Sequence, residues 1–356
     1  MMPDKVKLAD IARIRTGKLD SNAAVEDGEY PFFTCSQQTL RIDRPAYDTE
    51  AILLGGNNAA GVFPLKYYNG QFNAYQRTYI LETLDPNVLN TRYLYYALCP
   101  ALSHFQSASI GAATQYLTKG ILDNFRVILP SIGVQNHIAS TLSAYDDLIE
   151  NNRRRIQLLE QAARLLYKEW FVHLRFPGYE HTRIIDGVPE GWEEKNFGSI
   201  ATLKYGKALK NDDRVPGPIP VYGSSGIVGI HAKALVPGPT IIIGRKGNVG
   251  SVYWSPDDCH PIDTVYYIDS GHCSLFLYYA LQQMTFISTD VAVPGLNRDF
   301  AHSRLLLVAE QKILRLFEAT VSPLHQQMEL LKRQNASLAK ARDLLLPKLM
   351  TGEVSV

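Results

Sequence analysis

The chain contains the segment Ala51-Ile52-Leu53-Leu54-Gly55 and, much later, the similar segment Thr240-Ile241-Ile242-Ile243-Gly244. Each is a short apolar run that ends at a glycine, which is the pattern of a buried β-strand followed by a turn. At the same separation along the chain, Leu8-Ala9-Asp10-Ile11-Ala12 is matched by Phe197-Gly198-Ser199-Ile200-Ala201. Matches at a constant separation indicate an internal repeat, so the sequence predicts two copies of one fold.

The repeat continues through a pair of predicted helices. Tyr93-Leu94-Tyr95-Tyr96-Ala97-Leu98 is matched by Phe276-Leu277-Tyr278-Tyr279-Ala280-Leu281, which predicts the same amphipathic helix in both copies. Each copy then enters a long stretch in which apolar residues recur three, four and seven residues apart, such as Ile138, Leu142 and Ile149. This spacing is typical of a long helix with one apolar seam.

The second long stretch contains two prolines. Its predicted apolar positions include Leu316, Thr320 and Leu324, and Pro347 is expected to stop the helix. Pro323 predicts a kink, or a restart with Ser322 as N-cap, because a proline inside a helix costs about 3 kcal/mol.

The turn-rich segment between the copies gives the domain boundaries. It runs from Phe176-Pro177-Gly178-Tyr179 to Gly191-Trp192. We therefore expect a first domain over residues 1–130, a central spacer helix over 131–175, a linker and second domain over 176–308, and a C-terminal spacer helix over 309–356.

Composition restricts the classes of function. Among the 356 residues, 36 Lys and Arg nearly balance 35 Asp and Glu, so any surface that attracts nucleic acid must be local. Cys35, Cys99, Cys259 and Cys273 lie far apart without a CxxC spacing, which favours a reduced cytoplasm over a disulfide scaffold or zinc site. The sequence has no apolar run of about 18 residues, so we expect a cytoplasmic protein that does not bind membranes.

Four motifs resemble the specificity subunits of type I restriction-modification systems. They are Pro220-Val221-Tyr222-Gly223-Ser224-Ser225-Gly226, Gly244-Arg245-Lys246-Gly247-Asn248-Val249-Gly250, Val188-Pro189-Glu190-Gly191-Trp192 and Leu345-Leu346-Pro347-Lys348-Leu349-Met350-Thr351-Gly352-Glu353-Val354. Each motif alone is weakly specific, but together they occur in the family's order, and the resemblance covers nearly the full chain. The first half departs from the pattern at Tyr30-Pro31-Phe32-Phe33-Thr34-Cys35-Ser36 and at Gly55-Gly56-Asn57-Asn58.

The resemblance implies an α+β fold of mixed helices and strands. It consists of two pseudo-symmetric globular target recognition domains, separated by two long antiparallel coiled-coil-like helices. In that family, each domain reads one half of a bipartite, asymmetric DNA target. The implied partners are double-stranded DNA, two modification (methyltransferase) subunits and the restriction (endonuclease and translocase) subunits. S-adenosylmethionine, ATP and Mg belong to those partner subunits, and adenine methylation is their reaction, so the chain itself is expected to hold no cofactor.

Glycine-rich loops with Ser, Asn, Arg and Lys suit DNA, because backbone N–H groups approach phosphates while side chains read base edges. In the second half we predict DNA contacts from loop residues of this kind: Lys207, Tyr222, Ser224, Ser225, Arg245, Lys246, Asn248, Asn297 and Arg298. In the first half, the corresponding places hold Lys18, Ser36, Gln37, Asn57, Asn58, Gln76, Arg77, Gln115, Thr118 and Lys119. Asn and Gln can pair bidentately with adenine, although polar loop residues are also common where nothing binds.

Apolar residues at the ends of the two long helices have two interpretations. Tyr167, Trp170 and Phe171 end the first helix, and Leu345, Leu349 and Met350 end the second. They either pack the helices within the chain or form part of an interface with the modification subunits.

The sequence lacks the motifs of the reactions that the partners perform. It contains no Pro-Pro pair, as an adenine methylase loop would require, no GxGxxG after a strand and no GxxxxGK[ST]. It also lacks HExxH and GxSxG, so we expect a non-catalytic chain without a metal site. Two alternatives remain: a helical scaffold whose duplicated domains bind proteins or glycans, and the equivalent subunit of a two-chain system that cuts on both sides of its site.

Overall fold

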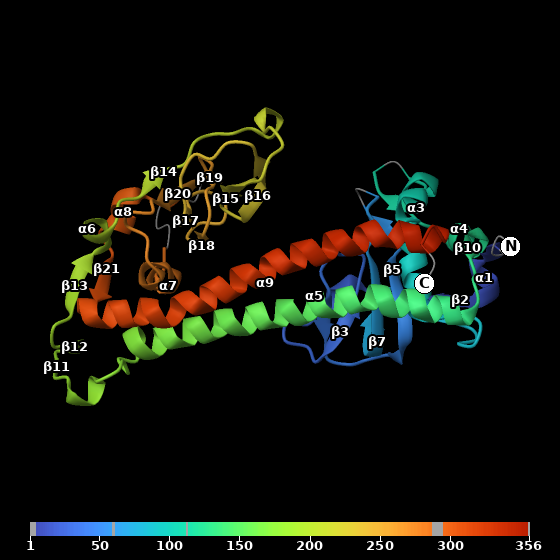
Figure 1. Cartoon of the computed structure of the whole chain (residues 1–356), viewed down its shortest axis with the longest axis horizontal. Helices are drawn as coiled ribbons and strands as arrows, with labels where there is room; N and C mark the ends of the chain where they lie inside the picture. Colours follow the sequence, from blue (N-terminus) through green and yellow to red (C-terminus); the bar gives the residue numbers. More distant parts are fainter. Residues whose placement is uncertain (1–4, 59–60, 112, 287–294, 355–356) are drawn as a thin grey trace. The chain divides into compact units, whose positions relative to one another are not determined.

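The computed structural model describes residues 5–58, 61–111, 113–286 and 295–354 (Figure 1). Its internal contacts divide the chain into two compact units. Unit 1 comprises Met1–Asn152 and Arg333–Val356, and unit 2 comprises Arg153–Lys332. Each long helix therefore contributes one part to each unit.

Unit 1 is built on a six-stranded sheet. The strand order is β2 (Ala12–Thr16), β8 (Thr78–Thr83), β5 (Tyr47–Gly55), β7 (Leu65–Ala74), β3 (Tyr30–Phe33) and β4 (Leu40–Ile42). The predicted strand Ala51–Gly55 is the buried end of β5, which pairs antiparallel with β7 and β8. β3 instead pairs parallel with β7.

Short elements complete unit 1. β1 (Lys5–Lys7) pairs with β10 (Arg126–Ile128), and β6 (Asn57–Asn58) pairs with β9 (Gln115–Tyr116). The helical segments are α1 (Leu8–Ile11), the 3-10 turn Ser21–Ala23, α2 (Thr91–Leu98), α3 (Leu102–Ala108) and α4 (Lys119–Asn124).

Unit 2 repeats this plan with shorter strands. One sheet has the order β14 (Lys204–Tyr205), β20 (Val265–Ile268), β17 (Thr240–Gly244) and β18 (Val252–Ser255). A second has the order β16 (Gly226–His231), β15 (Ile219–Gly223) and β19 (His260–Pro261). β15 and β19 pair parallel, as β3 and β7 do in unit 1.

Unit 2 also contains two short strand pairs and several short helical segments. β11 (Ile184–Ile185) pairs with β12 (Val188–Pro189), and β13 (Glu193–Asn196) pairs with β21 (Leu305–Val308). The helical segments are the 3-10 turns Tyr179–His181 and Asn211–Asp213, α6 (Phe197–Ile200), α7 (Leu275–Gln283) and α8 (Arg298–His302).

Equivalent hydrogen bonds occur inside each of the two units, which confirms the predicted duplication. Gly17 N donates to Thr78 O at 3.1 Å, and Gly206 N donates to Val265 O at 3.2 Å. The Tyr79 hydroxyl donates to Leu117 O at 2.8 Å, and the Tyr266 hydroxyl donates to Leu296 O at 3.1 Å. The two copies therefore share their internal geometry although most of their side chains differ.

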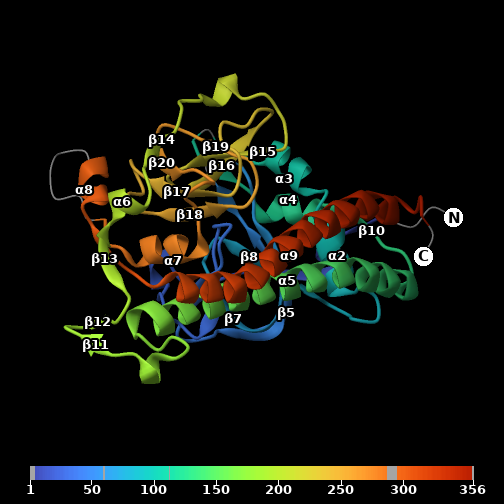
Figure 2. The ribbon, with the colours of Figure 1, turned by 60° about the vertical axis from the view of Figure 1, so that its left-hand side comes forward.

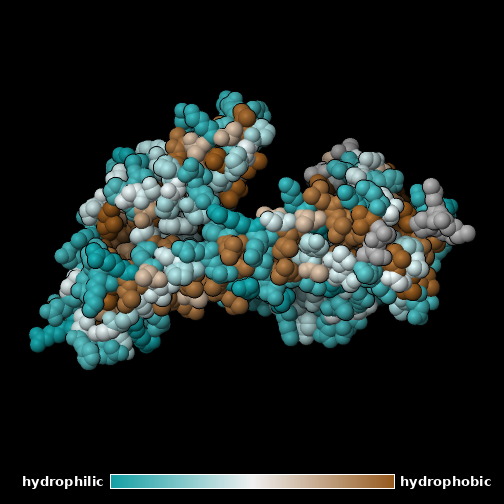
Figure 3. Space-filling model, in the orientation of Figure 1, coloured by the Kyte–Doolittle hydropathy of each residue, from teal (hydrophilic) through white to brown (hydrophobic). Residues whose placement is uncertain are grey.

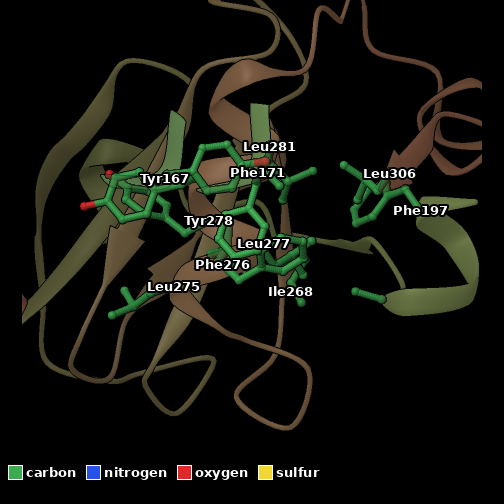
Figure 4. Packing of buried hydrophobic residues seen from close by; sticks show 14 of the residues in the cluster. Tyr167, Phe171, Phe197, Ile268, Leu275, Phe276, Leu277, Tyr278, Leu281 and Leu306 are labelled. Atoms are coloured by element: carbon green, nitrogen blue, oxygen red, sulfur yellow. The ribbon is translucent and has the colours of Figure 1, made fainter. Parts of the chain in front are cut away.

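The core of unit 2 gathers aromatic side chains around α7 (Figure 4). Phe171 lies with its ring centre 4.8 Å from that of Phe276 and 5.0 Å from that of Phe317. Phe197 and Leu306, from α6 and β21, belong to the same core. Burying side chains of this size stabilises the unit by about 1.5–3 kcal/mol each.

The long helices are α5 (Ile132–Tyr167), which continues as a π-helical turn over Lys168–Val172, and α9 (Gln311–Thr351). In unit 1, α5 and α9 lie side by side (Figures 1 and 2), and Asp146 of α5 forms an ion pair with Arg342 of α9. Because Asn152 bonds to Asn335 while Asp146 bonds to Arg342, the helices run antiparallel there.

Two expectations for α9 are wrong. The helix runs without a break through Pro323, so it does not restart at Ser322, and it continues past Pro347 to Thr351. Val321, just before Pro323, and Leu349, just after Pro347, are both buried. Burying these two side chains offsets the backbone hydrogen bonds that the prolines cannot make. Between residues 316 and 321 the buried positions lie one residue later than predicted, because Phe317 and Val321 are buried while Leu316 and Thr320 are exposed. Ile313 and Leu331 are buried as predicted.

The helices α2 and α7 each form hydrogen bonds with a long helix of their own unit. In unit 1 the Tyr96 hydroxyl donates to Asp146 Oδ2 at 2.6 Å, and Gln135 Oε1 accepts from Asn90 N at 2.9 Å. In unit 2 the Tyr279 hydroxyl lies 2.7 Å from His325 Nε2, and Glu318 Oε1 accepts from Phe276 N at 3.0 Å.

Within residues 5–58, 61–111, 113–286 and 295–354, every helix is too short or too polar to cross a membrane. In the same residues, no group of three or more His, Cys, Asp and Glu side chains could hold a metal ion.

Candidate nucleic-acid interface

A tight turn follows β17 in unit 2. Gly244 N donates to Ser251 O at 2.7 Å, and Gly250 N donates to Gly244 O at 2.9 Å. A side chain on Gly244 would place its Cβ 2.1 Å from Asn248 O, so only glycine fits. The turn leaves the predicted contact residues Lys246 and Asn248 exposed.

Two arginines from separate segments meet over one aromatic ring. The guanidinium carbon of Arg245 lies 5.0 Å from the centre of the Tyr205 ring, and that of Arg298 lies 5.6 Å from it. Lys246 forms a β-bridge with Gly295 in the segment just before Arg298. We call Tyr205, Arg245, Lys246 and Arg298 the basic cluster. The structure thus brings Arg298 next to Arg245 and Lys246, which were predicted from a different segment.

Tyr205 was not among the predicted contact residues. It is 50% exposed, and its ring packs at 4.9 Å on Tyr266, which is 2% exposed. Burial raises the pKa of Tyr266 to about 12, so its hydroxyl stays protonated at neutral pH and donates to Leu296 O. Leu296 N in turn donates to Arg245 O at 2.8 Å, which fixes the positions of the two segments.

The other predicted residues of the second half have different environments. Asn297 caps α8, since its Oδ1 accepts from Asp299 N and Phe300 N. Tyr222 is only 6% exposed and packs in a small core with Val236 and Ile242. Its ring therefore offers little surface to DNA. Lys207 and Ser225 are exposed, while Ser224 O accepts from Ser251 Oγ at 2.6 Å.

In unit 1, amide side chains gather on the short β6–β9 pair. Asn57 lies opposite Tyr116, and Asn58 lies opposite Gln115. Arg77 lies over the Tyr116 ring at 5.5 Å. We call Asn57, Asn58, Arg77, Gln115 and Tyr116 the amide cluster.

One buried oxygen atom of the amide cluster lacks a hydrogen bond. Among the described residues, Asn57 Oδ1 has no hydrogen-bond partner although it is inaccessible to solvent. Gln115 is held by Ser109 Oγ, which donates to its Oε1 at 2.9 Å, and by its own donation to Gly111 O at 2.8 Å. Leaving a buried acceptor without a hydrogen bond is costly.

The remaining predicted residues of the first half lie on exposed loops or helix ends. Lys119 forms an ion pair with Asp123 inside α4 at 2.7 Å, and Thr118 immediately precedes that helix. Ser36 Oγ accepts from Gln38 N at 3.2 Å. Lys18, Ser36, Gln37 and Gln76 are exposed.

Comparison with known proteins places the chain in a family. The model of the type I restriction modification DNA specificity domain matches residues 4–161 and 189–300, one segment in each half of the repeat. The chain belongs to this family of type I DNA specificity domains.

Similar relatives include two type I specificity subunits. The EcoDI specificity subunit of Escherichia coli is 32% identical over 221 residues, which is 56% of this chain and 48% of the relative. The MjaIX specificity subunit of Methanocaldococcus jannaschii is 26% identical over 306 residues, which is 75% of this chain and 69% of the relative. The match thus spans about half the length of the Escherichia coli relative.

A solved type I structure has the same fold. The crystal structure of a type I restriction-modification S subunit from M. genitalium aligns with a TM-score of 0.65 at 22% identity, covering 98% of this chain and 99% of that chain. The predicted mixed fold of helices and strands with long helices is confirmed.

The long helices of this chain expose different apolar residues from those we predicted as a partner interface. Tyr167, Trp170 and Phe171 are buried in the core of unit 2, and Leu349 in that of unit 1, so these side chains offer little surface to a partner. Leu345 and Met350 are half-buried against the core of unit 1. Leu158 and Leu165 of α5, in contrast, are 63% and 60% exposed, and Figure 3 shows apolar patches among the polar surface of the helices.

Proposed function

We propose that the chain is the DNA-specificity subunit of a type I restriction-modification complex. In this proposal each unit is a target recognition domain that reads one half of a bipartite, asymmetric DNA target. The observation that carries it is the basic cluster, where Arg245 and Arg298 converge on the half-exposed ring of Tyr205. The membership of the family supports the same role.

The chemistry of the basic cluster suits DNA. A guanidinium group binds phosphate, or reads guanine bidentately at O6 and N7. Stacking on Tyr205 restricts the motion of both arginines before DNA arrives, which lowers the entropy lost on binding. The net charge of +1 is compatible with DNA binding because the positive charge is local.

Catalysis is assigned to partner subunits in this proposal. Two modification subunits would bring S-adenosylmethionine and methylate adenine, and restriction subunits would bring ATP and Mg. The chain would act in the cytoplasm, where the DNA substrate lies, and its own residues would supply positioning and base readout. Leu158 and Leu165 on α5 are apolar surface that a modification subunit would cover.

The test is to co-express the chain with the methylase encoded beside it and to map methylated adenines by single-molecule sequencing. A split motif with a fixed gap, lost when this chain is deleted, is the expected result. Methylation that is unchanged after the deletion, with the complex intact, would overturn the proposal and favour a protein-binding or glycan-binding scaffold.

A further inference from the structure

One position of the repeat carries two chemically different residues that make the same contact. Lys66 of β7 pairs with Leu53, and Tyr253 of β18 pairs with Ile242. Leu53 and Ile242 match in the repeated strand segments, so Lys66 and Tyr253 are equivalent positions of the two units. Each side chain donates a hydrogen bond to a backbone carbonyl in a turn that carries predicted DNA contacts.

In unit 1 the turn lies between β3 and β4. Lys66 Nζ donates to Ser36 O at 3.1 Å and to Thr39 Oγ1 at 3.1 Å, so it bridges the start and the end of the turn. The two residues between these ends, Gln37 and Gln38, are exposed. Lys66 therefore holds a turn whose amide side chains point to solvent, where they can reach base edges.

Lys66 connects this turn to the sheet. Two other hydrogen bonds, from Ser36 N to Thr34 Oγ1 and from Gln38 N to Ser36 Oγ, join the turn only to itself. The ammonium group of Lys66 instead lies 5.9 Å from the centre of the buried Phe33 ring, and burial lowers the pKa of Lys66. Its side chain thus extends over the protein rather than into solvent.

In unit 2 the corresponding turn is Ser224–Ser225, between β15 and β16. Tyr253 Oη donates to Ser224 O at 3.2 Å, and Ser251 Oγ donates to the same carbonyl at 2.6 Å. Ser251 O accepts from Gly244 N. These bonds join the turn to the neighbouring loop of the basic cluster.

The strand register shows that the two turns correspond. Tyr75 N donates to Phe33 O at 2.9 Å in unit 1, and Ile262 N donates to Tyr222 O at 2.9 Å in unit 2. The carbonyl that accepts from Lys66 follows three residues after Phe33, and the one that accepts from Tyr253 follows two residues after Tyr222. The contact is therefore present in both copies, although the donor has changed from an ammonium group to a phenol.

We propose that Lys66 and Tyr253 are positioning residues for base readout, each holding the turn that reads one half of the DNA target. The proposal rests on the function proposed above. A turn that is fixed before DNA arrives loses less conformational entropy on binding. The benefit is largest for the correct sequence, because hydrogen bonds to base edges depend on the exact place of the turn.

A direct phosphate contact by Lys66 would have a different signature. It would weaken binding to every sequence when lost, and it would reduce the slope of log K against log salt by about 1. A positioning residue changes the preference for the correct sequence and leaves that slope unchanged. The neutral Tyr253 makes the equivalent contact in unit 2, which favours positioning.

The test measures fluorescence anisotropy of the assembled complex with duplexes that carry the methylated motif intact, altered in one half, or altered in both. We expect Lys66→Met to lower the affinity ratio between the intact duplex and the duplex altered in one half by about tenfold. The ratio for the other half and the salt slope should not change. The double variant S251A/Y253F should have the same effect on the other half, so each variant is the control for the other.

Two further variants separate the contact from the charge. Lys66→Arg keeps a cationic donor and should retain most of the preference. Lys7→Met removes an exposed charge of the same unit and should change neither ratio. Melting temperatures show whether each variant folds, and hydrogen exchange should become faster at the amides of Gln37, Gln38 and Thr39 in Lys66→Met.

The outcomes separate this inference from the proposed function. If the wild-type complex does not prefer the intact motif, the proposed function fails. If Lys66→Met and S251A/Y253F keep the wild-type ratios, the positioning role is overturned while the proposed function stands. An equal loss of affinity for all duplexes in Lys66→Met, with a lower salt slope, would also overturn it and would make Lys66 a phosphate contact.

Discussion

Asn152 of α5 and Asn335 of α9 hydrogen-bond to each other inside the helix pair of unit 1. Asn152 Nδ2 lies 3.0 Å from Asn335 Oδ1, and Asn335 Nδ2 lies 3.3 Å from Ile149 O. Asn152 is 2% exposed, in a seam whose other buried residues, such as Leu142 and Ile149, are mostly apolar. A buried amide pair of this kind lowers stability but specifies which residues face each other along two helices.

Removing one amide should therefore cost more than removing both. We expect Asn152→Leu to destabilise the protein by about 1–3 kcal/mol, because Asn335 Oδ1 loses the donor that Asn152 Nδ2 supplies. The double variant N152L/N335L should recover most of that loss, since an apolar pair replaces a polar one. Urea unfolding of the single and double variants measures both effects. Asn151→Leu, on the exposed side of α5, is the control and should change stability little. Additive losses in the double variant would contradict this account.

His325 should make stability depend on pH. Burial lowers its pKa from 6.5 to about 4 in the folded protein, where it faces Tyr278, Tyr279, Glu160, Glu329 and Lys332. The unfolded chain binds a proton near pH 6.5 that the folded chain refuses until about pH 4, so stability falls as pH drops through this window and levels off below it. The full effect is about 3 kcal/mol.

The measurement is thermal unfolding between pH 7 and pH 4.5, with His325→Gln as the comparison. Glutamine retains a hydrogen-bonding group for the Tyr279 hydroxyl but does not titrate, so the variant should lose less stability than wild type over this range. His272→Gln removes an exposed histidine that contacts Asp269 and serves as the control. Equal slopes for wild type and His325→Gln would exclude His325 as the cause.

The sequence predicts the repeated strands and helices because each is a local pattern. It does not predict the contact between Arg245 and Tyr205, since 40 residues separate them along the chain and they meet only because β14 and β17 both pair with β20. It also misplaces two buried positions of α9. Leu316 and Thr320 fit a helical period as well as Phe317 and Val321 do, and only contacts with the rest of unit 2 decide which pair is buried.

Sequence rules for helix ends and turns also fail where burial in a core stabilises a different local structure. Pro347 is expected to end α9, yet Leu349 is buried in the core of unit 1 beyond it and holds the helix together. Likewise, the turn signal at Tyr222 suggests an exposed contact, whereas the strand β15 carries its side chain into a small core.

The basic cluster should make DNA binding depend on salt. If Arg298 contacts a phosphate, Arg298→Ala should weaken binding to every sequence and reduce the slope of log K against log salt by about 1. Tyr205→Ala should have a similar but smaller effect by freeing the arginines, and Tyr205→Phe should have little, because the ring remains. Fluorescence anisotropy with the assembled complex measures these slopes. Arg183→Ala, on the exposed linker, provides the matched loss of charge. A slope that Arg298→Ala leaves unchanged would exclude a phosphate contact.

The two units should control different halves of the DNA target. Arg245 belongs to unit 2, where a guanidinium can read guanine, and Asn57 belongs to unit 1, where an amide can read adenine. We expect Arg245→Ala to relax the methylated motif in one half only and Asn57→Ala to relax it in the other, each by about 1–3 kcal/mol per contact. Methylome sequencing of strains that carry each variant gives the motifs. If both variants alter the same half, the assignment of one half to each unit is wrong.

Leu158 and Leu165 should anchor the modification subunit through the exposed face of α5. They lie seven residues apart, so they share one face of the helix, and both are more than half exposed. The double variant L158E/L165E should weaken association strongly, because a partner would have to bury two carboxylates without counter-ions. Gln157→Glu/Gln161→Glu adds the same charge at neighbouring exposed positions and should weaken association much less. Analytical ultracentrifugation of each variant with the modification subunit measures association, and melting temperatures close to wild type would show that both variants fold. Equal weakening by the two double variants would mean that added charge, and not loss of the leucine contacts, causes the effect.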